Sequence, residues 1–291
     1  TLNKKAYIVI DNPTSSIIPL MNTFRDNQDY EADMFVNNHE AKEIMDDNTL
    51  LVVVDTNKPS ITQCEDLLYM AKMIVVLDHH RQGSDTIRNS VLSYIEPYAS
   101  SASEMVAEIL QYFTEGIRIR NVEADSIYAG IMIDTDNFMQ KTGVRTFEAA
   151  AFLRRCGADV TRVRKLFRED MNDYKARGET IRNAELFRGQ FAISECPSDY
   201  VDSPTVVGAQ AANELLNIVG VKASFVLTEY KGVIYISARA IDEVNVQIIM
   251  ERMGGGGHLN MAGCQLETVN MEGARNLLKS TLTEMQDGGE I

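Results

Sequence analysis

Two short apolar runs constrain the fold of this chain more than any other feature. Residues 50–54 read Leu-Leu-Val-Val-Val, and residues 73–77 read Met-Ile-Val-Val-Leu. Runs of this length, rich in β-branched residues, are typical of parallel strands buried on both faces. The first run ends in Asp55 and the second in Asp78–His80. Ligands bind open α/β sheets at the carboxyl ends of the strands, so we expect these polar residues to line a binding edge.

A third carboxylate, Asp134, follows a densely apolar segment that begins near Val122 and that we expect to be a buried helix. A carboxylate at a helix carboxyl end is disfavoured by the helix dipole and by desolvation, and a metal would offset both effects. The alternative is that Asp134 simply reaches solvent. For Asp78–His80 the alternative is a capped turn with surface histidines, but two successive strands that end in carboxylates favour a cation site.

We therefore group Asp55, His79 and Asp134 as candidate metal ligands. Oxygen and nitrogen donors in this mixture suit Mn²⁺, Fe²⁺ or Zn²⁺ better than Ca²⁺. A carboxylate can also bridge two metals about 3.5–4 Å apart, an arrangement that serves phosphoester hydrolysis. Asp78 is expected to orient His79, and His80 is expected to donate to a phosphate oxygen or to the leaving group.

The second strong motif is a run of four glycines, Gly254–Gly257, followed by His258. Glycines let the backbone approach a ligand closely and turn N–H groups toward an anion, whereas the alternative is a flexible loop after a helix. Nearby basic residues favour phosphate or base binding. The candidate substrate-binding residues are Gly255, Gly256, Gly257, His258 and Arg239.

The 291 residues are enough for two domains. We expect an α/β fold, with a parallel-sheet domain over residues 1–188 and a smaller mixed α/β domain over residues 189–291. A helical connector that includes residues 174–187 joins them. The net charge of −14 argues against binding to duplex nucleic acid. Because no apolar run approaches about 18 residues, we expect no membrane contact from this chain.

Taken in order, these motifs resemble those of the DHH-family phosphoesterases with their associated C-terminal domain. The motifs are Asp55-Thr-Asn57, Asp78-His-His-Arg81, Asp134–Phe138 and Gly254–His258. Within the family, the chain is most similar to the catalytic region of the GdpP-type cyclic-di-AMP phosphodiesterases. The stretches that carry this similarity are Asp55–Ser60, Ile95–Ser101 and Lys141–Phe147.

The resemblance implies Mn²⁺-dependent opening of cyclic di-AMP to linear pApA. It implies that Asp55 bridges two metals and that His79 and Asp134 bind one of them. It also implies that the glycine loop and Arg239 contact the nucleotide. Finally, it implies a homodimer and a cytoplasmic catalytic region whose parent protein is anchored in the cell membrane.

One departure from the family pattern concerns the amino end. The family begins its catalytic domain with a strand and a His-x-x-x-Asp-x-Asp motif, which nothing before Asp55 matches. We expect the amino end to be incomplete, and a polypeptide this short to bind metal weakly and to be nearly inactive. Two alternatives stay open: a phosphoesterase of the same fold that acts on short oligoribonucleotides or adenosine bisphosphate, and a non-catalytic nucleotide-binding module.

Overall fold

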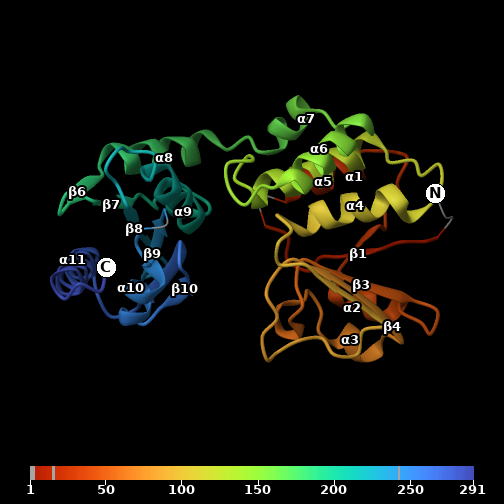
Figure 1. Ribbon diagram of the computed structural model, residues 1–291, viewed down its shortest axis with the longest axis horizontal. Coiled ribbons are helices and arrows are strands. Elements are labelled where there is room, and N and C mark those ends of the chain that lie inside the picture. Colours follow the sequence, from red (N-terminus) through yellow and green to blue (C-terminus); the bar gives the residue numbers. More distant parts are fainter. Residues whose placement is uncertain (1–3, 15–16, 242) are drawn as a thin grey trace. The chain divides into compact units, whose positions relative to one another are not determined.

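The computed structural model describes residues 4–14, 17–241 and 243–291 and has the α/β fold expected from the sequence (Figure 1). The chain divides into two compact units, residues 1–168 and 169–291. This division lies before helix α8 (Met171–Arg182), whereas the sequence places the boundary after residue 188. The domain assignment drawn from the sequence stays a prediction.

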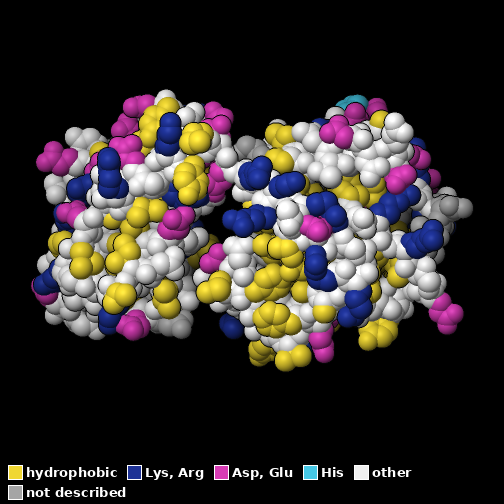
Figure 2. All heavy atoms as spheres, turned by 90° about the horizontal axis from the view of Figure 1, so that it is seen from above, with side chains coloured by type: hydrophobic (Ala, Val, Ile, Leu, Met, Phe, Trp, Pro, Cys, Tyr) yellow, Lys and Arg dark blue, Asp and Glu magenta, His cyan; other side chains and the backbone are white. Residues whose placement is uncertain are grey.

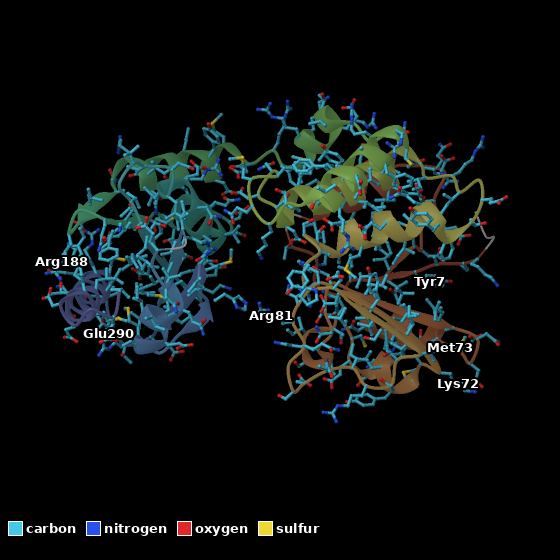
Figure 3. All side chains as sticks on the ribbon, in the orientation of Figure 1. Tyr7, Lys72, Met73, Arg81, Arg188 and Glu290 are labelled. Atoms are coloured by element: carbon cyan, nitrogen blue, oxygen red, sulfur yellow. The ribbon has the colours of Figure 1, made fainter. Side chains whose placement is uncertain are left out.

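A three-stranded parallel sheet carries the motif residues of the first unit. Its strands are β3 (Leu50–Val54), β4 (Met73–Asp78) and β5 (Leu92–Ile95), with β4 in the centre. Val54 pairs with Leu77, and Leu77 pairs with Tyr94, so the three strands end at the same level. Figure 3 labels Met73 and Arg81 at opposite ends of β4, and the motif residues lie at the Arg81 end.

The core of this sheet is small and aliphatic, and it includes Val53, Ile74 and Val76. Strand β3 is an edge strand of this sheet, and its Leu50, Val52 and Val54 side chains are about half exposed. A separate pair of short parallel strands, β1 (Ile8–Val9) and β2 (Phe35–Val36), precedes it in the chain. The residue that follows β3 is therefore approachable from the open side of the sheet.

Four helices of the first unit pack against one another around a second core that includes Ala129, Ile131 and Leu153. They are α4 (Ala102–Phe113), α5 (Asn121–Asp134), α6 (Val144–Arg155) and α7 (Val160–Leu166). Two others are α1 (Ile18–Arg25) and α2 (Asn38–Ile44), and Ala41 of α2 packs in another core with Val36 of β2. A short helix, α3 (Asp66–Met70), joins β3 to β4. Among the described residues, every helix is too short or too polar to cross a bilayer.

The second unit is built on a six-stranded mixed sheet with the order β10-β11-β9-β8-β7-β6. Only β7 and β8 run parallel. The strands are β6 (Glu185–Phe187), β7 (Phe191–Cys196), β8 (Ala223–Tyr230), β9 (Val233–Ala240), β10 (Gly256–His258) and β11 (Met261–Leu266). One apolar core packs the sheet against α10 (Val246–Arg252) and α11 (Met271–Asp287), and another packs it against α8 and α9 (Pro204–Leu215).

One expectation from the sequence is wrong in this unit, and the alternative of a flexible loop holds for only part of the glycine run. The connecting helix does not reach Phe187, because α8 ends at Arg182 and residues 185–187 form the edge strand β6. The glycine run is not a loop along its whole length either, because Gly256 and Gly257 belong to strand β10 and pair with β11. A run of glycines has no side-chain periodicity, so its strand pairing cannot be read from the sequence.

Gly257→Ala should destabilise the second unit. A Cβ at this position would lie 2.5 Å from Cα of Ala262, and the residue has a φ of +149°. We expect a loss of about 1–3 kcal/mol in the free energy of unfolding, measured by urea denaturation. Gly256→Ala is the matched control, because nothing lies within 4 Å of its added Cβ. An equal loss in both variants would contradict the close approach of β10 to β11.

Candidate functional site

Asp55 is the residue that immediately follows β3. Its N–H donates to the carbonyl oxygen of Leu77 at 2.9 Å, so the backbone is still held against β4. Its φ is +65°, in the left-handed region. This conformation costs a non-glycine residue about 1–2 kcal/mol. Strain of this kind at a half-exposed carboxylate favours a functional role.

His79 faces two carboxylates with one ring nitrogen. Its Nε2 lies 3.2 Å from Asp55 Oδ1 and 3.7 Å from Asp134 Oδ2. The other ring nitrogen, Nδ1, lies 3.4 Å from the carbonyl oxygen of Ala99. A carbonyl can only accept, so the neutral ring carries its proton on Nδ1 and presents a lone pair at Nε2. Two carboxylates beside that lone pair repel it unless a proton or a metal cation lies between them.

The pKa values of His79 and Asp134 are both raised. The pKa of His79 is raised, chiefly by its hydrogen bond to Asp55, although burial acts in the opposite direction. The pKa of Asp134 is raised by burial first and then by the charge of Asp55. In both cases the protein favours additional positive charge at this point. A proton on Nε2 and a bound metal would therefore compete for the same position.

Asp134 is the last residue of α5, and the chain leaves the helix through a strained turn. Asp136, Asn137 and Phe138 have φ values of +46°, +57° and +67°. The turn is held by a bond from the Asn137 N–H to the Met132 carbonyl oxygen at 2.8 Å, and by stacking of Phe138 on Phe147 with ring centroids 5.9 Å apart. Three consecutive left-handed residues that are not glycine make this turn unusual.

Asp78 does not orient His79 as the sequence analysis expected. Its fully buried carboxylate accepts from His80 instead, with Oδ1 lying 2.7 Å from Nδ1 of that ring. The other oxygen, Oδ2, accepts from Nδ2 of Asn57 at 2.5 Å. Strand β4 ends at Asp78, and the rings of His79 and His80 lie close together beyond it, with centroids 4.4 Å apart, so the choice of His80 as the partner of Asp78 does not follow from strand alternation.

Asn57 is a site residue to which the sequence analysis assigned no role. Its side chain is 2% exposed, and its Nδ2 also lies 3.3 Å from the carbonyl oxygen of His80. It therefore ties the residues after β3 to those after β4. The sequence feature that could have identified Asn57 is its position two residues after Asp55, from which a side-chain amide can reach the neighbouring strand.

The donor set fits a divalent cation of the manganese or zinc type. Ligand atoms of Asp55, His79 and His80 all lie within 4.8 Å of one another, and Asp134 approaches the same imidazole nitrogen. Nδ1 of His80 is occupied by Asp78, which leaves its Nε2 available. Carboxylate oxygens combined with imidazole nitrogens are the ligands such metals take in proteins.

A groove of about 370 Å³ adjoins these donors within the first unit. It lies between β3, α4 and α5, and Asp55 and Asp134 belong to its lining. The rest of the lining is mostly small or apolar and includes Val54, Ala102 and Gly130. The two carboxylates are thus accessible to a ligand that enters the groove.

The glycine run of the second unit has two distinct parts. The N–H groups of Gly254 and Gly255 donate to the carbonyl oxygens of Glu251 and Met250, at 3.0 and 2.8 Å, and close the end of α10. These two groups are therefore not turned toward an anion, contrary to the expected nest. Gly256 faces open space.

Strand pairing places the remaining candidates on one face of the sheet. His258 pairs with Met261, and Met261 pairs with Arg239. In the next row Gly256 pairs with Gly263. Paired residues point to the same side of a sheet, so two glycines form a flat area beside Arg239 and His258.

Arg239 has few partners in this arrangement. Its Nη1 donates to the carbonyl oxygen of Ala238 at 2.9 Å, and its Nε is buried. Within the described ranges, neither a partner for Nε nor an ion pair to this guanidinium is found. Burial lowers the pKa of Arg239. A partly buried guanidinium without a carboxylate favours an anionic ligand.

Residues 8–131 match the DHH family, N-terminal domain, and residues 191–284 match the DHHA1 domain. The chain is 41% identical over 293 residues to the cyclic-di-AMP phosphodiesterase GdpP of Bacillus subtilis (strain 168), covering 99% of this chain and 44% of that protein. It is 38% identical over 283 residues to the cyclic-di-AMP phosphodiesterase PdeA of Listeria monocytogenes serotype 1/2a (strain 10403S), covering 96% and 43%.

The chain thus spans less than half the length of these two relatives. Among solved structures, an exopolyphosphatase-related protein from Bacteroides fragilis matches with a TM-score of 0.79. The sequence identity is 19%, and the match covers 97% of this chain and 83% of that one, so the likeness shows a shared fold. The two matched domains and the two relatives together place the chain: it belongs to the DHH family and combines the family's N-terminal domain with a DHHA1 domain.

Proposed function

We propose that this chain is the catalytic part of a metal-dependent phosphodiesterase that hydrolyses cyclic di-AMP to linear pApA. The observation that carries the proposal is the meeting of Asp55, His79 and Asp134 at one edge of the sheet. The choice of substrate is supported by relatives of 41% and 38% identity that are named cyclic-di-AMP phosphodiesterases.

Mn²⁺ is the proposed metal. Asp55, with a half-exposed carboxylate, is the proposed bridging ligand, and His79 and Asp134 are proposed to share one ion. A bound metal of this class supplies hydroxide near neutral pH and stabilises the charge of the phosphoester transition state. The Ala99 carbonyl keeps the proton on Nδ1 of His79, so that Nε2 can act as a ligand.

His80 and Asp78 are proposed to act on the phosphate. Asp78 accepts from Nδ1–H of His80, so when the ring is protonated at both nitrogens its Nε2–H is the donor for a phosphate oxygen or the leaving group. Asn57 holds Asp78 in turn and restricts the orientation of the pair. His80 is thus the proposed catalytic donor, and Asp78 is a positioning residue.

In the second unit, Gly255, Gly256, Gly257, His258 and Arg239 are proposed to contact the nucleotide. The flat area at Gly256 and Gly263 gives a base or ribose close access to the backbone. Arg239 supplies a positive charge for a phosphate. Gly255 and Gly257 contribute by allowing β10 to approach β11, since a Cβ on either would lie within 2.5 Å of that strand.

We further propose that the protein acts as a homodimer and is the cytoplasmic part of a longer, membrane-anchored protein, as the resemblance to the GdpP-type enzymes implies. Duplex nucleic acid is not a proposed partner. In Figure 2, acidic, basic and hydrophobic side chains are mixed over one unit, whereas Lys and Arg side chains gather over the other, and the net charge of the whole chain is −14. A small dinucleotide can still be bound under these conditions, because a metal or an arginine supplies positive charge locally.

His79→Ala should reduce both Mn²⁺ affinity and Mn²⁺-dependent hydrolysis of cyclic di-AMP. Loss of an outer partner of a metal ligand costs about 10–100-fold, so loss of the ligand itself should cost at least about 100-fold in rate. Hydrolysis is followed by chromatography of pApA, and Mn²⁺ binding by calorimetry. Addition of EDTA should abolish turnover by the parent protein.

His39→Ala is the matched control for this experiment, because His39 is an exposed histidine on α2. It should leave metal affinity and rate unchanged. A His79→Ala protein that hydrolyses cyclic di-AMP at the parental rate would contradict the metal role. Turnover of pApA or of short oligoribonucleotides well above that of cyclic di-AMP would favour the alternative phosphoesterase.

Arg239→Gln should weaken the binding of cyclic di-AMP. A hydrogen bond to a charged group contributes about 1.5–3 kcal/mol, so we expect a loss of roughly 10–100-fold in affinity, measured by calorimetry with and without Mn²⁺. Arg252→Gln is the control, since that arginine is already paired with Glu290 at 3.2 Å. Unchanged affinity in Arg239→Gln would contradict the proposed substrate surface. Tight binding of cyclic di-AMP by the unsubstituted protein, with the same affinity in the presence and absence of Mn²⁺, would favour a non-catalytic binding module.

A further inference from the structure

The peptide bond between Ala99 and Ser100 lies between His79 and a buried carboxylate. Its carbonyl oxygen, from Ala99, is 3.4 Å from Nδ1 of His79. Its N–H, from Ser100, donates to Oε2 of Glu104 at 3.4 Å. In a trans peptide the C=O and N–H groups point in opposite directions. One planar group therefore has the imidazole on one side and the carboxylate on the other.

Glu104 is placed too deeply for an ordinary first-turn residue of a helix. It is 1% exposed, and its Oε2 also accepts from the Ser100 hydroxyl at 2.5 Å. Capping of α4 does not need this carboxylate, because Ser101 already accepts from the Glu104 N–H at 2.9 Å. A charge buried this far must be held by specific donors. The donors closest to Oε2 belong to the residue that follows Ala99.

The cation nearest to Glu104 is committed mainly to another residue. Nε of Arg145 lies 4.0 Å from Oε1 of Glu104. The same guanidinium forms two short bonds to Glu108, at 2.7 and 2.6 Å. Glu108 lies one turn further along α4 and has no hydrogen bond to Ser100 among those found in the described part of the chain. The two glutamates share an arginine, but only Glu104 reaches the peptide that faces His79.

We propose that Glu104 is a positioning residue for His79. Its carboxylate orients and polarises the Ala99–Ser100 peptide, whose carbonyl keeps the proton on Nδ1 of His79 and leaves Nε2 for the metal. Hydrogen bonds in series strengthen one another, so a carboxylate at the far end increases the negative charge on the carbonyl oxygen. The effect is that of a carboxylate paired directly with a metal-bound histidine, transmitted through one peptide group. The inference rests on the metal role proposed above for His79.

Glu104→Gln tests the inference, because glutamine keeps the size of the side chain and an acceptor for Ser100 but removes the charge. We expect Mn²⁺ affinity to fall about 3–10-fold, less than the 10–100-fold typical of a partner bonded directly to a ligand. Affinity is measured from the free Mn²⁺ signal in electron paramagnetic resonance. Glu108→Gln is the matched control, since it removes the same charge beside the same arginine, and it should change affinity by less than about twofold.

A second readout does not depend on metal. In the metal-free protein, at a pH where the ring is neutral, two-bond ¹⁵N–¹H spectra report which nitrogen of His79 carries the proton. The parent protein and Glu108→Gln should show the same proportions of the Nδ1–H and Nε2–H forms, and Glu104→Gln should show a larger share of the Nε2–H form. If Glu104→Gln does not fold, Ser100→Ala, which removes only the hydroxyl bond to Glu104, should move both readouts in the same direction by a smaller amount.

The outcomes separate this inference from the function on which it rests. A parent protein that binds no Mn²⁺ would contradict the proposed function, while the tautomer of His79 would still test the link to Glu104. A parent protein that binds Mn²⁺, with an unchanged affinity and tautomer in Glu104→Gln, would overturn the positioning role. Equal losses in Glu104→Gln and Glu108→Gln would also overturn it, because they would indicate a general effect of charge.

Discussion

The repulsion between two carboxylates that share one imidazole nitrogen is the constraint on which the proposed site depends. Asp55 and Asp134 reach Nε2 of His79 from different elements, the end of β3 and the end of α5. Bringing them together raises the free energy of the folded state unless positive charge is added. The pKa of His79 is raised chiefly by its hydrogen bond to Asp55, and that of Asp134 is raised by burial and then by the charge of Asp55, so both shifts favour added positive charge. A cation therefore stabilises the same arrangement that it needs for binding.

The backbone around the site is strained where the donors are placed. Asp55 has a left-handed conformation, and so do Asp136, Asn137 and Phe138 just beyond Asp134. Strain of this kind persists only when the surrounding structure determines it. Here the support comes from pairing of β3 with β4 and from stacking of Phe138 on Phe147. The rigid parts of the first unit thus fix the positions of two flexible carboxylate side chains.

The sequence was sufficient to predict the parallel strands and the proximity of three donors. Apolar runs that end in carboxylates identify both the strands and their common edge, and the dense apolar helix before Asp134 identifies the third donor. The metal role of these donors stays a prediction. The sequence was insufficient for contacts that depend on side-chain direction at the edge. Asp78 was expected to orient His79, but it holds His80, and the partner of His79 is a backbone carbonyl twenty residues away.

Glycines and buried polar residues account for the other differences. Gly254 and Gly255 close a helix with their N–H groups, whereas Gly256 and Gly257 belong to a strand. A run of four identical residues contains no pattern from which these two roles could be predicted. Asn57 and Glu104 look like ordinary turn and capping residues in the sequence. Both side chains are buried next to the site, and this burial results from tertiary packing, which the sequence does not show.

Pulsed electron paramagnetic resonance of the Mn²⁺-loaded protein tests the central claim most directly, because nuclear modulation reports a nitrogen bound to the metal. We expect nitrogen modulation in the parent protein, its retention in His39→Gln, and a clear loss of modulation and of bound Mn²⁺ in His79→Gln. Nitrogen modulation that is absent from the parent protein, or that is unchanged when His79 is replaced, would contradict the convergence of Asp55, His79 and Asp134 on one metal.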